Sequence, residues 1–239
     1  MDSKVITVWG SNGSGKTSVA VNLGVALAER NFMVGIISSK LYYGDLQSFF
    51  GKRLENDKGI YKAISNGCNT KNMFESAISG ANLFFLSVPN GFDAMLLTSI
   101  SGDTAKELIE DAMMRFDYII IDGNEELNNP ISSIGLTMSN KIIITHSVST
   151  KDCIWQNSME NTMQLLNLSD KIIHVLNAYD KTCDKMVYMN SIGVKLNFEL
   201  PYISNGKILA NSGKPYYMSS TVPNEYKKII DRLANQVMV

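Results

Sequence analysis

The stretch GSNGSGKT, residues 10–17, decides the fold of this chain. It fits the phosphate-binding pattern G-x-x-x-x-G-K-[ST] at every defined position. An apolar, β-branched run precedes it (KVITVW, 4–9), and residues 16–30 (KTSVAVNLGVALAER) follow with apolar side chains at helical spacing. A strand, a glycine-rich turn and a helix in this order are the context that the pattern requires. They predict a P-loop.

The composition of this loop suits a phosphate chain. Glycines allow successive backbone N–H groups to turn toward phosphate oxygens, and the positive end of the following helix points at the same anion. Lys16 is expected to reach the β- and γ-phosphates, and the Thr17 hydroxyl to ligate Mg²⁺. We therefore expect ATP and Mg²⁺ as cofactors. The residues expected to bind nucleotide here are Gly10, Ser11, Asn12, Gly13, Ser14, Gly15, Lys16, Thr17 and Ser18. The alternative is a glycine-rich turn with an accidental Lys-Thr pair.

A second apolar strand, DYIIID at residues 117–122, ends in a carboxylate. In an open α/β sheet, ligands bind beyond the carboxyl ends of the strands. Asp122 is therefore the candidate to hold Mg²⁺ together with Thr17, through a water molecule. The other interpretation of Asp122 is a turn or helix-capping aspartate.

Short apolar runs alternate with helical stretches along the rest of the chain. This alternation predicts an α/β fold: an open, doubly wound, mainly parallel sheet of about seven or eight strands with helices on both faces. No linker, repeat or low-complexity tract divides residues 1–239, so we expect a single nucleotide-binding domain. Further strands are expected at 33–37, 83–88, 141–145 and 172–177, and further helices at 104–115, 154–166 and 223–237.

The composition narrows the class of protein. Hydrophobic residues make up 45% of the 239 and the net charge is −1, which favours a packed core and gives no strong sign of nucleic-acid binding. Three cysteines without a paired spacing are typical of a reducing compartment. No apolar run is long enough for a membrane span, and the start lacks the features of a secretory signal. We expect a cytoplasmic protein whose membrane contact is at most peripheral.

Taken together, these motifs resemble the MinD/ParA class of P-loop ATPases. Beyond the loop, the similarity includes the segments ELIEDAMMRFDYIIIDGNEEL (107–127), IHVLN (173–177) and LPY (200–202). The resemblance implies the doubly wound fold, ATP binding and a nucleotide-dependent homodimer. It also implies a role as a spatial organiser of a protein complex, in partitioning, pilus or secretion assembly. Asn177 and Pro201 stand where the family contacts the adenine.

Two positions depart from the family pattern. The signature lysine of the family follows the first glycine, where this chain has Ser11. The second strand of the family ends in Asp-x-Asp, where this chain has Ser38-Ser39-Lys40. These departures from the family pattern imply weak or no ATP hydrolysis. The resemblance is nearest to the divergent TadZ/CpaE-like branch of the family.

Lys40 joins Lys16 and Asp122 as a candidate catalytic residue, because it is expected near the γ-phosphate. There it would restore the missing positive charge, in cis or across a dimer. A solvated loop lysine is the plainer interpretation. Glu125 and Glu126, which follow Asp122 closely, are interpreted as a solvated acidic pair.

Two other functions stay open. One is a non-hydrolysing, ATP-bound interaction scaffold, which a phosphate-release assay would distinguish from an ATPase. The other, less well supported, is a small-molecule enzyme of the dethiobiotin-synthetase kind. Such an enzyme shares the loop but needs a polar substrate pocket that the sequence does not reveal.

Overall fold

The computed structural model describes residues 3–93 and 100–239. Within them, an eight-stranded sheet has the order β3-β4-β2-β5-β1-β6-β7-β8. Neighbouring strands of this described sheet pair in parallel, except that β3 is antiparallel to β4. This confirms the predicted fold class. The strands are β1 (Lys4–Gly10), β2 (Val34–Ser38), β3 (Glu75–Ser76), β4 (Leu83–Leu86), β5 (Tyr118–Asp122), β6 (Lys141–His146), β7 (Ile172–Tyr179) and β8 (Phe198–Pro201).

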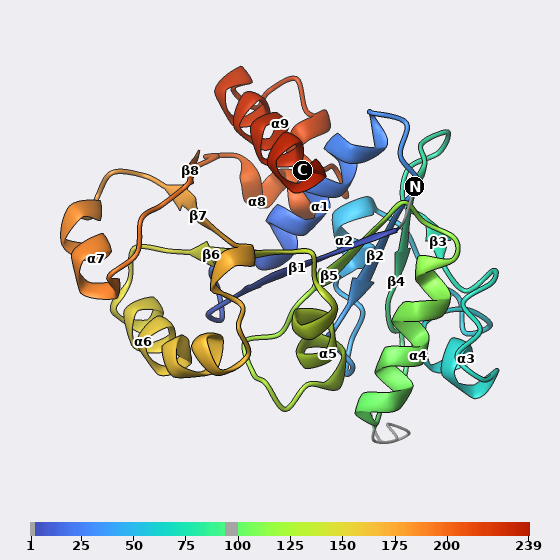
Figure 1. The fold of residues 1–239 in the computed structure, drawn as a ribbon. Helices are drawn as coiled ribbons and strands as arrows, with labels where there is room; N and C mark the ends of the chain where they lie inside the picture. The colour runs from blue at the N-terminus through green and yellow to red at the C-terminus, as the bar shows by residue number, and fades with distance from the viewer. Residues whose placement is uncertain (1–2, 94–99) are drawn as a thin grey trace.

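Helices cover both faces of the sheet, with α1 and α9 on one side and α4, α5 and α6 on the other (Figure 1). The α-helices are α1 (Lys16–Ala28), α2 (Leu46–Phe50), α3 (Ile60–Ser65), α4 (Gly102–Met113), α5 (Pro130–Met138), α6 (Thr150–Leu165), α7 (Lys185–Ile192), α8 (Gly206–Asn211) and α9 (Asn224–Met238). Short 3₁₀ turns lie before β7 and α9, namely η2 (Ser169–Lys171) and η3 (Tyr216–Met218).

The central strand β1 is buried on both faces, as its continuous apolar sequence predicts. Ile6 and Val8 pack into the cluster that contains α1 and α9. Val5 packs with α4 on the opposite face, and Trp9 packs beside α6. Successive side chains of this one strand therefore pack into different hydrophobic clusters on opposite faces of the sheet.

Helix α6 begins earlier than the pattern of apolar residues predicts, at Thr150 instead of residue 154. Ser149 caps it, because its side chain accepts a hydrogen bond from the Asp152 backbone N–H. The apolar pattern starts only after the first turn, since that turn is polar. Helix α6 therefore begins closer to the end of β6 along the chain than the apolar pattern predicts.

The register of the strands places the predicted site at one edge of the sheet. Val8 pairs with Asp122 across β1 and β5, and Ser38 pairs with Asp122 across β2 and β5. Gly10 pairs with Thr145 of β6. Because β1 leads directly into the P-loop, the ends of β2, β5 and β6 all lie beside that loop.

The apolar stripe of α9 is buried. Ile229, Ile230 and Leu233 belong to the core cluster that includes α1. Among the helices of the described residues, none has the length and apolarity needed to cross a bilayer.

Candidate nucleotide site

The P-loop is held in a turn that two of its glycines make possible. Gly15 has a φ of 88°, and a Cβ there would lie 1.9 Å from Asn177 Nδ2. A Cβ on Gly10 would lie 2.5 Å from the Thr145 carbonyl oxygen. The Ser14 hydroxyl fixes the turn by hydrogen bonding with the Ser11 carbonyl at 2.8 Å and Thr145 Oγ1 at 2.6 Å. Only residues without a side chain fit these two positions, so the loop geometry follows from its sequence.

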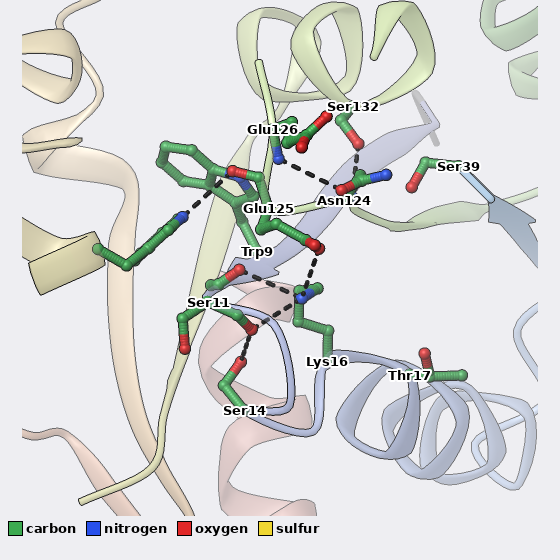
Figure 2. Close-up of polar contacts among 12 residues, drawn as sticks. Trp9, Ser11, Ser14, Lys16, Thr17, Ser39, Asn124, Glu125, Glu126 and Ser132 are labelled. Atoms are coloured by element: carbon green, nitrogen blue, oxygen red, sulfur yellow. Dashed lines mark hydrogen bonds and ion pairs between the residues drawn. The ribbon is translucent and has the colours of Figure 1, made fainter. Parts of the chain in front are cut away.

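Lys16, at the start of α1, folds back over the P-loop (Figure 2). Its Nζ donates hydrogen bonds to the Gly10 carbonyl at 3.2 Å and to the Ser11 carbonyl at 2.9 Å. It also forms an ion pair with Glu125 Oε2 at 3.5 Å. Burial lowers the pKa of the Lys16 ammonium, and the charges of Glu125 and Asp122 offset only part of that effect. The Lys16 ammonium therefore lies against the P-loop, and its contact with the phosphates stays a prediction.

Thr17 and Asp122 form the second part of the site. The Thr17 hydroxyl donates to Asp122 Oδ2 at 2.9 Å. Asp122 is 1% exposed, and its other oxygen, Oδ1, is buried without a hydrogen-bond partner among the described residues. Burial, and then the nearby charge of Asp45, raises the pKa of Asp122 to about 7. A buried, partly unsatisfied carboxylate beside a hydroxyl fits Mg²⁺, which prefers hard oxygen ligands.

Lys40 follows β2 and lines the same cleft as Lys16. Its Nζ forms an ion pair with Asp45. Burial lowers the pKa of Lys40, but the charges of Asp45 and Asp122 outweigh this effect, and the pKa lies above its ordinary value. The lysine is thus a partly buried cation beside the P-loop, and its predicted role toward the γ-phosphate stays a prediction.

The cleft lined by Lys16, Thr17 and Lys40 has a volume of about 580 Å³. Its walls come from the P-loop and the start of α1, from the segment after β2 and from the segment after β5. Tyr42 and Tyr43 lie at its rim, and their side chains are 65% and 62% exposed. The polar residues that line the cleft are Asn12, Lys16, Thr17, Ser18, Lys40, Asp45, Asn124, Glu125, Glu126, Asn128 and Asn129.

Asn177 and Pro201, the two residues expected at the adenine, lie on neighbouring strands. Asn177 Nδ2 donates to the Ser14 carbonyl at 3.1 Å, so this side chain contacts the P-loop. It also lines a smaller hollow of about 210 Å³ behind the loop. Pro201 ends β8 in register with Tyr179. Asn177 is therefore brought to the site, and the adenine contacts of both residues stay predictions.

Ser11, at the position of the family lysine, turns its side chain into the protein. Its hydroxyl donates to Asp152 Oδ1 at 2.6 Å. The other Asp152 oxygen accepts from the Ser147 N–H at 2.9 Å and from the Tyr188 hydroxyl. Sequence reasoning missed Asp152. The signal was present, because Ser149 and Asp152 have the S-x-x-D spacing of a helix N-terminus.

Both histidines of the chain belong to the same polar network. His146 Nδ1 hydrogen bonds with the Tyr188 hydroxyl at 2.8 Å, and His146 Nε2 with His174 Nδ1 at 2.9 Å. Burial, together with repulsion from His146, lowers the pKa of His174 to about 4. Burial raises the pKa of Asp152, but hydrogen bonds from its side-chain partners outweigh this and leave its pKa below the ordinary value. The network links β6, β7, α6 and α7 behind the P-loop.

The interpretation of Glu125 and Glu126 as a solvated acidic pair is wrong for Glu125. Only Glu126 is exposed, whereas Glu125 is partly buried against Lys16. The main chain of Glu125 is held as well, because Trp155 Nε1 of α6 donates to its carbonyl oxygen at 3.1 Å. The acidic sequence alone carries no signal that separates these two neighbours.

A sequence profile of the AAA-domain family matches residues 3–179. The chain belongs to this family. No curated protein sequence matches the AAA-domain chain.

Solved structures show the fold of the AAA-domain chain. A ParA family ATPase from Chlorobium tepidum superposes with a TM-score of 0.81 at 17% identity, covering 98% of this chain and 99% of that one. The septum site-determining protein MinD from Pyrococcus horikoshii, complexed with Mg-ADP, gives 0.78 at 18% identity and covers 98% and 96%. A MinC:MinD cell division protein complex from Aquifex aeolicus gives 0.77 at 17% identity and covers 98% and 96%. The AAA-domain chain therefore has the MinD/ParA-like P-loop fold, and the TadZ/CpaE-like branch stays a prediction.

Proposed function

We propose that this protein binds ATP with Mg²⁺ and acts as a nucleotide-dependent spatial organiser of a protein complex. The observation that carries the proposal is that Lys16 and Thr17 line one cleft and that Thr17 donates a hydrogen bond to the buried carboxylate of Asp122. Lys16 and Thr17 belong to the phosphate-binding motif, and the pairing of β5 with β1 supports a role for Asp122 beside them. An arrangement of this kind recognises a polyphosphate and its cation.

In this proposal, different residues of the chain bind the phosphates, the Mg²⁺ ion and the adenine. The backbone N–H groups of residues 10–17 bind the phosphate oxygens, and Lys16 neutralises the β- and γ-phosphates. Thr17 and Asp122 would hold Mg²⁺, which when bound neutralises phosphate charge. Asn177, already in contact with the P-loop, contacts the adenine together with Pro201.

The organising role rests on the proteins of the same fold. Their names describe a septum site-determining protein, a ParA family ATPase and a MinC:MinD complex. We infer a homodimer formed with nucleotide, working in the cytoplasm on a protein partner in partitioning, pilus or secretion assembly. The exposed Tyr42 and Tyr43 at the rim of the cleft supply apolar surface beside the nucleotide for such a contact.

We infer that this site hydrolyses ATP slowly or not at all. The side chain of Ser11 carries no charge and is bound to Asp152, and Ser38 and Ser39 offer no carboxylate to position water. The same observation favours a second function, a non-hydrolysing scaffold that stays bound to ATP. Phosphate release separates the two, because a scaffold shows tight ATP binding with no turnover above background.

Size-exclusion chromatography with light scattering tests the proposal. The protein is compared without nucleotide, with ADP·Mg²⁺ and with a non-hydrolysable ATP analogue and Mg²⁺. We expect a monomer in the first two conditions and a dimer with the ATP analogue. The variant Lys16→Ala is expected to stay monomeric throughout. A monomer of the unaltered protein in every condition would contradict the organiser.

A further inference from the structure

The ion pair between Lys16 and Glu125 places an acidic side chain at the lysine of the P-loop. Glu125 Oε2 lies 3.5 Å from Lys16 Nζ, and the two side chains are 32% and 7% exposed. Figure 2 shows Glu125 pointing to the Lys16 ammonium from the segment that follows β5. The carboxylate therefore lies at the group that a phosphate of the nucleotide must also reach.

The main chain around Glu125 is fixed in this position from several sides. Trp155 Nε1 donates to the Glu125 carbonyl, and the Trp155 ring packs edge-on against Trp9 with 4.7 Å between centroids. The Asn124 N–H donates to Ser132 Oγ at 2.6 Å at the start of α5. The approach of the carboxylate to Lys16 is consequently part of the fold of this segment.

A carboxylate at this place competes with phosphate for the same cation. Lys16 uses two of its N–H groups on the Gly10 and Ser11 carbonyl oxygens, which leaves one for an anion. Two anions beside one buried ammonium repel each other strongly, because burial weakens the screening by water. The Glu125 carboxylate must therefore leave Lys16 when a phosphate chain binds.

We propose that Glu125 sets the nucleotide affinity of this site by competing with the phosphates for Lys16. The inference rests on the proposed function, because it assumes that a polyphosphate binds the P-loop. Binding opens the Lys16–Glu125 pair and turns the Glu125 carboxylate away from Lys16, while the main chain of the segment stays anchored. Trp155 reports this change, since its indole N–H is bonded to the carbonyl of the same residue.

Glu126 provides the matched control. It has the same charge, lies in the next position and lines the same cleft, but its side chain is exposed. Its backbone N–H donates to Asn124 Oδ1 at 3.3 Å, an interaction that a side-chain amide leaves unchanged. Glu125→Gln and Glu126→Gln remove the same charge from the cleft, and only the first removes the partner of Lys16.

Calorimetric titration with pyrophosphate, ADP·Mg²⁺ and ATP·Mg²⁺ compares the unaltered protein with both variants. We expect Glu125→Gln to lower the Kd about fivefold to tenfold, and Glu126→Gln to stay within about twofold. Tryptophan emission is expected to change on pyrophosphate binding in the unaltered protein and in Glu126→Gln, and to change much less in Glu125→Gln.

The outcomes separate the inference from the function on which it rests. If the unaltered protein binds and the two variants have equal affinities, the competition is refuted and the proposed function stands. If Glu125→Gln binds more weakly than Glu126→Gln, Glu125 supports the phosphates and the inference is again refuted. If none of the three proteins binds any of the ligands, the proposed function fails, and the competition fails with it.

Discussion

The hydroxyl of Ser11 donates a 2.6 Å hydrogen bond to the carboxylate of Asp152, and the two residues are 1% and 0% exposed. This bond ties the second residue of the P-loop to the first turn of α6. The position that carries a lysine in the family pattern thus carries a neutral group that is used inside the protein. The bond anchors the P-loop to α6, and the basic side chains that line the cleft among the described residues are those of Lys16 and Lys40.

Loss of the Ser11 hydroxyl is expected to destabilise the protein. Ser11→Ala leaves a buried, ionised carboxylate with one hydrogen bond fewer, which should lower the free energy of unfolding by about 1–3 kcal/mol. Urea denaturation measures this. The control is Ser65→Ala, whose exposed hydroxyl donates to the Lys62 carbonyl one turn away, with an expected change within about 0.5 kcal/mol. Equal effects of the two variants would contradict the role of the buried bond.

Replacement of Asp122 is expected to separate metal binding from folding. Asp122→Asn removes a buried charge while keeping an acceptor for Thr17, so the melting temperature of the ligand-free protein should not fall. Mg²⁺ should tighten ATP binding about tenfold or more in the unaltered protein, and this gain should largely vanish in the variant. Calorimetry with Mg²⁺ and with a chelator measures it. An unchanged gain would exclude Asp122 from the metal site.

Lys40 and Asp45 should change ATP binding in opposite directions. Lys40→Ala removes a cation from the cleft and is expected to weaken ATP binding about threefold to tenfold, whereas Asp45→Asn frees Lys40 and should tighten it. ADP should respond less to both, because Lys40 is predicted near the γ-phosphate. Filter binding with both nucleotides provides the comparison. ATP affinity and dimerisation that do not respond to Lys40→Ala would refute a role for this lysine.

The lowered pKa of His174 predicts how the free energy of unfolding depends on pH. In the native state the pKa of His174 is lowered to about 4, whereas in the unfolded chain it lies near its ordinary value of 6.5. Between these values the unfolded state binds a proton that the native state does not. The contribution of His174 to stability is therefore complete above pH 6.5 and declines as the pH falls toward 4, by on the order of 3 kcal/mol.

Urea denaturation of the unaltered protein and of His174→Gln between pH 7 and 4 checks this dependence. The variant should lose much of the decline, while the carboxylates common to both proteins leave a shared remainder. Parallel curves for the two proteins would show that His174 does not titrate as its burial implies.

Local sequence determined much of the site. The glycines of residues 10–15 predict the turn because two of them adopt a geometry that side chains exclude, and Asp122 ends an apolar strand. The edge position of Asp122 follows from the parallel sheet, whose register pairs it with Val8. These features depend on neighbours in sequence or on a general property of parallel sheets, so the sequence was sufficient to predict them.

Other features of the site depend on contacts between distant segments. Glu125 and Glu126 are the same residue type in adjacent positions, and the bonds of the main chain to Trp155 and Ser132 hold the segment in which one carboxylate points toward Lys16. Asp152 looks like an ordinary helix-capping residue, and its bond to Ser11 spans 141 positions of the chain. Such pairs arise when α6 packs beside the P-loop, which no local pattern in the sequence records.

Titration calorimetry of the unaltered protein with ATP·Mg²⁺, beside Lys16→Ala, tests the central claim most directly. Lys16→Ala removes a charged hydrogen-bond donor worth about 3 kcal/mol to the phosphates, so its affinity should fall about 100-fold. Lys207→Ala, at an exposed position of α8, should bind like the unaltered protein. Binding at one site per chain that depends on Lys16 is the predicted result. The absence of heat with the unaltered protein, or equal affinity for Lys16→Ala, would contradict it.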